Sequence, residues 1–141
     1  MMQIRNAHLA DADVLVELLA QLDYSAAGFI KEKIAGLLSH PDAALLVAEQ
    51  DHLVRGFISL HFIPQIALAG DFCRVSYFCV DTTQTSRGIG KLLLEHAEEL
   101  ARQRGCDRME LHCHSRRLRS HAFYERQGYE DSPKYLMKKL G

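Results

Sequence analysis

Three absences limit the classes of protein to which this chain can belong. It has no stretch of 18 consecutive apolar residues, so we expect no membrane-spanning helix, which needs about 20. Its first residues lack the basic segment and apolar core of a secretory signal. Its 17 basic and 18 acidic residues nearly cancel, so no overall field attracts nucleic acid or a membrane surface. We therefore expect a cytoplasmic protein that binds neither.

Metal-ligating and disulfide patterns are also missing. The four cysteines contain no Cys-x-x-Cys pair, and most of them stand in or beside strand-like runs, as buried thiols of a cytoplasmic protein do (Cys73, Cys79, Cys106 and Cys113). The one candidate cluster is His112-Cys113-His114. Because successive side chains of a strand point to opposite faces, Cys113 would point away from both histidines. We expect no metal site.

The chain shows no repeat, low-complexity tract or linker, and we expect one domain over residues 1–141. Apolar spacing predicts a strand over 2–7, helices after residue 11 and over about 26–38, and strands over 43–49, 53–62 and 73–80. It then predicts a helix from 89 to about 104, a strand over 108–114 and a helix over 117–127. The chain is expected to end in a strand pair over 129–130 and 134–140. This mixed order predicts an α+β fold.

The most informative segment runs from Val80 to Lys91. A strand ends, a polar loop rich in Thr, Ser and Gly follows, and then a helix begins whose apolar stripe is Ile89, Leu92, Leu93, Ala97, Leu100 and Ala101. Such a loop points backbone N–H groups and the positive end of a helix at one anion. Side chains at Gly88 or Gly90 would hold a phosphate away from the backbone. The glycine pattern matches neither a Walker loop nor a dinucleotide fingerprint.

A second segment, His121 to Tyr129, reads as a short helix stopped by Gly128. Together the two segments resemble the GNAT family of N-acetyltransferases, through Phe78-Cys79-Val80, the loop 85–90, Phe123-Tyr124 and Gly128-Tyr129. Within that family, the length and layout look most like the subgroup that acetylates aminoalkylphosphonates and similar small amines. Thr85 departs from the Arg or Gln usual at its position, and Arg117 and Ser120 stand where Asn and Ala are common.

The resemblance implies a fold, a cofactor and a set of contacts. The fold is a mixed, mostly antiparallel sheet with helices on both faces and a V-shaped opening between the fourth and fifth strands. The co-substrate is acetyl-coenzyme A, with its pantetheine arm along Phe78 to Val80. The expected cofactor contacts of the loop are Thr85, Ser86, Arg87, Gly88, Ile89, Gly90 and Lys91, with the pyrophosphate on the N–H groups from Ser86 to Lys91. Of the run Arg116-Arg117-Leu118-Arg119, which reads as a solvated helix start, Arg117 is expected to contact the cofactor.

The same resemblance suggests catalytic roles. A backbone N–H of Cys79 or Val80 would face the oxyanion, and Tyr124 would protonate the leaving thiolate, since a phenol stays protonated at neutral pH. The general base remains open: a water held by Ser76 and Tyr77, or one of the histidines His61 and His114. Cys79 as a covalent acetyl acceptor is disfavoured, because it stands at an apolar strand position.

Two classes of function are compatible with these patterns. The first is an enzyme that transfers an acetyl group directly to the primary amine of a small molecule in a ternary complex, acting as a monomer or homodimer. The acceptor pocket would be built from the first two helices and the loop 62–71. The second is a non-catalytic acyl-coenzyme-A-binding regulatory module. It is favoured by Thr85 and by the absence of the Glu base that many relatives carry on the strand before the loop, where Tyr77 stands in this chain. No metal is expected in either.

Overall fold

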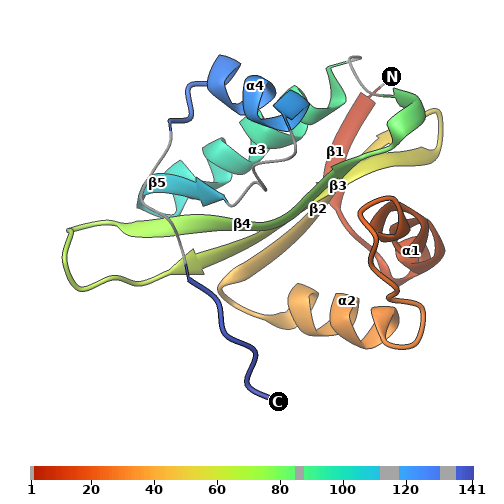
Figure 1. Ribbon diagram of the computed structural model, residues 1–141, viewed down its shortest axis with the longest axis horizontal. Helices are drawn as coiled ribbons and strands as arrows, with labels where there is room; N and C mark the ends of the chain where they lie inside the picture. Colours follow the sequence, from red (N-terminus) through yellow and green to blue (C-terminus); the bar gives the residue numbers. More distant parts are fainter. Residues whose placement is uncertain (1, 85–87, 112–117, 131–135) are drawn as a thin grey trace.

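A computed structural model describes residues 2–84, 88–111, 118–130 and 136–141, and its strands and helices follow one another in the mixed order that the sequence predicts up to α4 (Figure 1). The strands are β1 (Met2–Asn6), β2 (Ala43–Gln50), β3 (Leu53–Ile63), β4 (Asp71–Val80) and β5 (Cys106–Leu111). The helices are η1 (Leu9–Asp11), α1 (Ala12–Ala20), α2 (Ile30–Ser39), η2 (Thr82–Gln84), α3 (Ile89–Gln103) and α4 (Leu118–Arg126).

The five strands form one sheet in the order β1-β2-β3-β4-β5. Neighbours are antiparallel except β4 and β5, which are parallel and joined by α3 as the crossover. The β2–β3 turn places Asp51 at φ 54° and His52 at φ 64°, the left-handed conformations that a tight hairpin turn requires. The expected mixed, mostly antiparallel sheet is confirmed.

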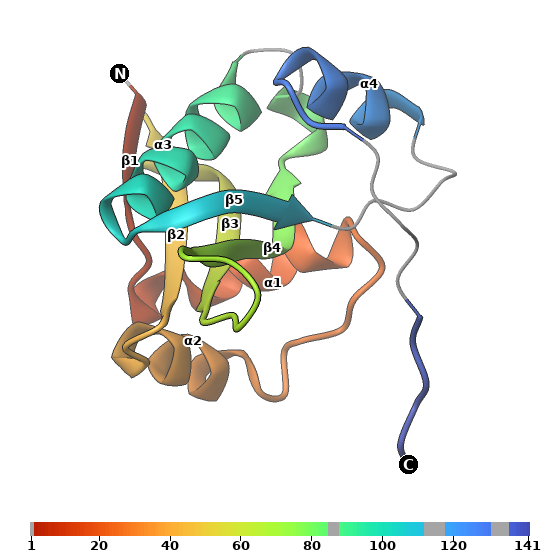
Figure 2. The ribbon, with the colours of Figure 1, turned by 90° about the vertical axis from the view of Figure 1, so that its left-hand side faces the viewer.

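Helices cover both faces of the sheet (Figure 2), and each face has its own core. On one face, α1 and α2 bury Leu15, Leu18 and Ile34 against the sheet. On the other, α3 lies across the strands, and Phe123 and Tyr124 of α4 pack beside it. The sheet is therefore sandwiched between two helical layers, and every functional segment below lies on one face or the other.

Helix α3 forms because its apolar residues recur every three or four positions. Its buried side chains are Ile89, Leu93, Leu94, Ala97 and Ala101. The predicted stripe was wrong at one position, because Leu92 is 39% exposed whereas Leu94 is 1% exposed. Gly105, at φ 79°, ends the helix as expected.

Other boundaries differ from the prediction. Helix α2 begins at Ile30 rather than Ala26, because residues 26–29 form a turn in which the Phe29 N–H donates to the Ala26 carbonyl at 3.1 Å. Strand β5 begins two residues earlier than expected, and residues 112–114 lie outside the described ranges.

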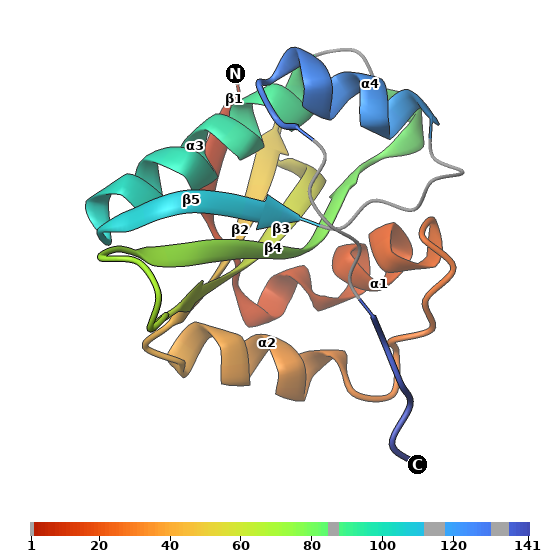
Figure 3. The same ribbon diagram turned by 60° about the vertical axis from the view of Figure 1, so that its left-hand side comes forward.

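The predicted terminal strand pair is wrong for the part of it that lies within the described residues. Residues 129–130 and 136–141 form no strand, and Leu136 and Leu140 are almost fully exposed. The last residues stand away from the sheet (Figure 3). An alternating apolar pattern favours a strand, but a strand also needs an edge with which to pair.

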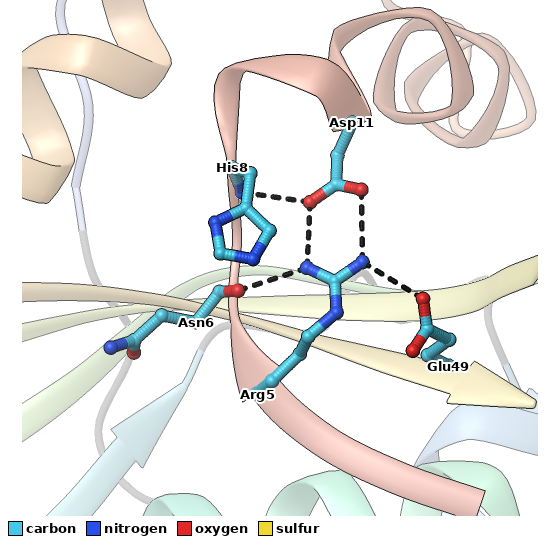
Figure 4. A network of polar contacts seen from close by, with 5 residues as sticks. All are labelled: Arg5, Asn6, His8, Asp11 and Glu49. Atoms are coloured by element: carbon cyan, nitrogen blue, oxygen red, sulfur yellow. Dashed lines mark hydrogen bonds and ion pairs between the residues drawn. The ribbon is translucent and has the colours of Figure 1, made fainter. Parts of the chain in front are cut away.

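A charged network fixes α1 to the sheet (Figure 4). The Arg5 guanidinium of β1 donates two hydrogen bonds to the Asp11 carboxylate, at 2.9 and 3.1 Å, and one to Glu49 of β2 at 3.2 Å. The His8 N–H also donates to Asp11, at 2.7 Å. Burial by itself raises the pKa of Asp11, but the hydrogen bonds from Arg5 and His8 outweigh it and lower that pKa.

None of the helices in the described ranges is long and apolar enough to cross a bilayer.

Candidate functional site

Strand β4 changes its pairing at Ser76. Before it, residues Asp71 to Val75 pair with both β3 and β5. In β3, Ser59 pairs with Tyr77 and Leu60 with Val75, so Ser76 is the extra residue of a β-bulge. Within the described part of the chain, no β4 residue beyond Val75 pairs with β5. The expected opening of the sheet between the two strands is confirmed, and their last described pair is Val75 with Leu111.

One side of this opening carries a wall of aromatic rings. Phe78 lies 6.2 Å, centroid to centroid, from both Phe123 and Tyr124 of α4. Tyr124 in turn lies 6.0 Å from Tyr129. Such edge-to-face and tilted contacts fix the rings relative to one another. They hold α4 against the end of β4, although 45 residues separate Phe78 from Phe123 in the sequence.

Tyr129 is a structural member of this wall. Its hydroxyl donates to the Glu98 carboxylate of α3 at 2.8 Å. Burial, followed by this hydrogen bond, raises the pKa of Tyr129 well above its usual value, so the phenol stays neutral. The contact joins the end of α4 to α3, and the Tyr129 N–H also donates to the Tyr124 carbonyl at 3.0 Å.

The N-terminus of α3 lies at the end of the same opening. Gly88 is its N-cap residue and has φ 81°, a conformation that disfavours any residue with a side chain. The Leu92 N–H donates to the Gly88 carbonyl, so the N–H groups of Ile89, Gly90 and Lys91 precede the first intrahelical bond. Three further predicted contacts, Thr85, Ser86 and Arg87, lie outside the described residues, as does Arg117.

The two glycines of the loop serve different needs. At Gly88 the positive φ is the constraint, whereas a Cβ there would meet nothing within 4 Å among the described atoms. At Gly90 a Cβ would lie 3.5 Å from each of Phe78, Val80 and Phe123, which is ordinary contact. An alanine therefore fits at Gly90, but a branched side chain would press on the aromatic wall.

Gly56, which the sequence reading did not single out, sets the distance between β3 and the end of β4. A Cβ at this position would lie only 2.9 Å from the Cys79 carbonyl oxygen and 3.2 Å from the Leu93 side chain. A glycine inside a strand often marks such a close backbone approach, and that signal was available in the sequence.

A short turn connects β4 to the loop. The Asp81 carboxylate accepts hydrogen bonds from the Thr83 N–H at 3.0 Å and its hydroxyl at 2.9 Å. These bonds lower the pKa of Asp81, the backbone one most. The side-chain oxygen of Gln21 accepts the Thr82 N–H at 3.0 Å, which ties this turn to the end of α1.

The other face of the opening is polar. Ser76 Oγ lies 2.9 Å from His61 Nε2 and 3.0 Å from Ser59 Oγ. Tyr77 is 41% exposed, and its ring meets that of Tyr24 edge-on at 5.3 Å. The structure thus brings together three of the predicted participants, His61, Ser76 and Tyr77. The alternative base, His114, lies outside the described residues.

Cys79 points away from the opening. It is buried in the core beneath α1 and α2, and its thiol donates to the Leu18 carbonyl with a sulfur–oxygen distance of 3.3 Å. A covalent role would require this thiol to reach a bound thioester, so the structure gives that disfavoured alternative no support. Only the backbone of Cys79 remains as a candidate.

The model of the acetyltransferase (GNAT) family matches residues 10–129. The chain belongs to this family. A curated relative, the aminoalkylphosphonate N-acetyltransferase of Salmonella typhimurium, is 31% identical over 135 residues, which cover 92% of this chain and 86% of the relative. The chain is therefore an acyltransferase of the N-acetylating kind, and the family implies acetyl-coenzyme A as the donor.

Solved structures share the fold. A transcriptional regulator from Bacillus halodurans superposes with a TM-score of 0.91 at 21% identity, over 99% of this chain and 100% of that one. The glucosamine-6-phosphate N-acetyltransferase of Arabidopsis thaliana superposes with a TM-score of 0.85 at 19% identity, over 100% and 99%. At these identities the likeness concerns the arrangement of the elements alone.

Proposed function

We propose that this acetyltransferase moves the acetyl group of acetyl-coenzyme A directly to the primary amine of a small molecule while both are bound. The observation that carries the proposal is the edge of β4 from Ser76 to Val80. It has no β5 partner in the described part of the chain, and it leads to the N-terminus of α3. Peptide groups on such an edge can pair with an extended ligand, and the helix terminus can receive its phosphates.

The donor would be held by the backbone more than by side chains. The peptide groups of Phe78 to Val80 would pair with the pantetheine arm as a strand would. Its pyrophosphate would accept N–H groups of the segment 86–91, with Thr85 and Arg117 flanking it. An N–H of Cys79 or Val80 would face the oxyanion, where a fixed donor stabilises developing charge.

Tyr124 would protonate the leaving thiolate. Its ring packs between Phe78 and Tyr129, and these contacts keep the phenol near the end of β4. Protonation of the sulfur is needed only as the carbon–sulfur bond breaks, so this contact would strengthen in the transition state.

The acceptor would enter from the polar face. That face holds Ser76 and Tyr77 of β4 and Tyr24 after α1, and it lies opposite the aromatic wall. The name of the Salmonella typhimurium relative specifies an aminoalkylphosphonate, a small amine, and the 31% identity supports an acceptor of similar size.

A thiol-release assay with acetyl-coenzyme A and a panel of amines tests the proposal. The panel contains aminophosphonates, polyamines, amino acids and peptide N-termini. We expect release with at least one small primary amine and little with peptides. Calorimetric binding of acetyl-coenzyme A without thiol release on any amine would overturn the proposal in favour of the non-catalytic binding module.

Direct transfer can be tested separately from the acceptor. Incubation with acetyl-coenzyme A alone should leave the intact protein mass unchanged, and Cys79→Ala, if folded, should keep its activity. An acetylated protein that passes its acetyl group to the amine, and loses this ability in Cys79→Ala, would replace direct transfer with a covalent route.

A further inference from the structure

The β-bulge at Ser76 has a chemical consequence for the polar face of the site. In a regular strand, Ser76 and Tyr77 would point to opposite faces. The extra residue turns both toward the face of α1 and α2, where Ser76 meets Ser59 and His61 of β3. Three polar side chains thus gather beside the place where β4 leaves β5.

We propose that His61 is the base of this acetyltransferase and that Ser76 passes the proton of the acceptor ammonium to it. The proposal rests on the proposed function and deepens it by naming how the acceptor is deprotonated. Neither residue is needed to hold acetyl-coenzyme A, whose expected contacts lie on Phe78 to Val80 and on the loop before α3.

The hydrogen-bond capacity of Ser76 fits this role. A serine hydroxyl has one proton to donate and two positions at which it accepts. Ser76 Oγ can donate its single proton to Ser59 Oγ at 3.0 Å, to the Ser59 carbonyl oxygen at 3.2 Å or to His61 Nε2 at 2.9 Å. When the hydroxyl turns to His61, the Ser59 hydroxyl can donate to Ser76 in its place. One accepting position remains, and Ser76 is exposed on the strand, so an ammonium N–H can use it.

The surroundings of His61 keep its imidazole neutral and able to accept. Burial, then the charges of His40 and Arg74, lower the pKa of His61 below its usual value near 6.5. Arg74, opposite His61 in the β3–β4 register, is paired with Glu110 of β5 at 3.0 Å, and Arg108 also binds Glu110, at 2.8 Å. Among the described residues, the charged groups near the imidazole are thus His40 after α2 and Arg74 of β4, with Glu110 and Arg108 of β5 behind Arg74.

The step balances. The ammonium gives one proton to Ser76 Oγ as Ser76 gives its own to His61, which leaves a neutral amine, an intact hydroxyl and an imidazolium. The amine nitrogen bonds to the acetyl carbon and the carbon–sulfur bond breaks. Tyr124 protonates the thiolate, the remaining extra proton of the nitrogen returns to Tyr124 through solvent, and His61 releases its proton to solvent. The products are the amide, the free thiol and one proton.

The test compares pH profiles of kcat/KM for wild type, His61→Gln and Ser76→Ala on the acceptor found in the panel. At pH 7 each variant should be slower by about 10²-fold, the usual contribution of a general base. The loss should shrink as the pH approaches the pKa of the amine, since the acceptor then arrives already neutral. Affinity for acetyl-coenzyme A should be unchanged. His96→Gln, an exposed histidine on α3, is the control and should keep the wild-type profile.

Non-additivity gives a second measurement. Because both residues serve one proton path, the double variant should be hardly slower than either single one. Folded His61→Gln and Ser76→Ala proteins with the wild-type pH profile would overturn the proton path and leave the proposed function standing. So would losses that multiply and persist at high pH. A wild-type protein that releases no thiol with any amine would overturn both.

Discussion

The two faces of β4 beyond Ser76 differ in chemistry and in cover. Toward α3 and α4, Phe78 and Val80 are partly buried against aromatic rings and the N-terminus of α3. Toward α1 and α2, Ser76 and Tyr77 are exposed beside His61, and only Cys79 is buried. One strand thus offers an apolar wall on one side and hydrogen-bonding side chains on the other. A thioester needs the first environment and an ammonium group needs the second, so we infer that the faces divide the donor from the acceptor.

The largest effect should come from removing the proposed acid on the apolar face. Tyr124→Phe keeps the ring contacts with Phe78 and Tyr129 and removes only the phenolic proton. We expect kcat to fall by about 10²-fold or more, with little change in the Kd of acetyl-coenzyme A. Steady-state kinetics and calorimetry measure the two. A folded Tyr124→Phe protein that turns over at nearly the wild-type rate would show that Tyr124 is only structural.

A change at Gly90 should weaken only the binding of acetyl-coenzyme A. Gly90→Val would press on Phe78, Val80 and Phe123 and crowd the N–H groups of the helix terminus. Loss of one hydrogen bond to an anion costs about 2 kcal/mol, so the Kd of acetyl-coenzyme A should rise about 30-fold. Gly90→Ala is the matched control and should bind nearly as wild type, because its Cβ fits at 3.5 Å from these side chains. If the folded Gly90→Val protein and wild type bind acetyl-coenzyme A with equal affinity, the cofactor does not bind at this loop.

A change at Asp11, before α1, should lower the stability of the fold and leave the catalysed reaction unaffected. Asp11→Asn weakens the network with Arg5 and should lower the free energy of unfolding by about 1–2 kcal/mol at pH 7. Since the pKa of Asp11 is lower in the folded state than in the unfolded chain, its contribution is present above the unfolded value and is lost as the pH falls through the folded one.

Denaturant titrations of wild type and Asp11→Asn at several pH values check this. The difference between the two should shrink in acid, below about pH 4, where the unfolded carboxyl begins to bind a proton. If the difference in free energy of unfolding stays constant down to the pH of acid unfolding, the charge of Asp11 does not contribute to stability.

The smallest effect should come from Tyr77→Phe on the polar face. The variant keeps the edge-on contact with Tyr24 and removes one hydroxyl. If Ser76 and His61 carry the proton, the loss should be that of one hydrogen bond to the acceptor or a water, less than about tenfold in kcat/KM. A loss as large as that of Ser76→Ala would instead favour a water held jointly by Ser76 and Tyr77 as the base.

Local patterns were enough to predict the elements that form the proposed donor side. The spacing of Ile89, Leu93 and Ala97 predicts α3, and the glycines before it predict a tight N-terminus, because both depend on residues close in sequence. The family resemblance assigned both Phe78 and Tyr124 to the cofactor site, and in the structure their ring centroids lie 6.2 Å apart. The same patterns were wrong for the terminal strand pair, since alternation of apolar residues does not supply an edge with which to pair.

The sequence by itself determined the order of the elements from β1 to α4, most of the apolar stripe of α3 and the glycine-rich loop, because each is a short-range consequence of side-chain spacing and backbone freedom. Only the tertiary structure decided that Ser76 is a bulge residue and that it meets His61, 15 positions earlier. A bulge exists only relative to a partner strand, and the register between β3 and β4 is fixed by how both pack against the two helical layers. The proposed donor side thus rests largely on elements that local sequence predicts, whereas the proposed acceptor side depends on strand pairing.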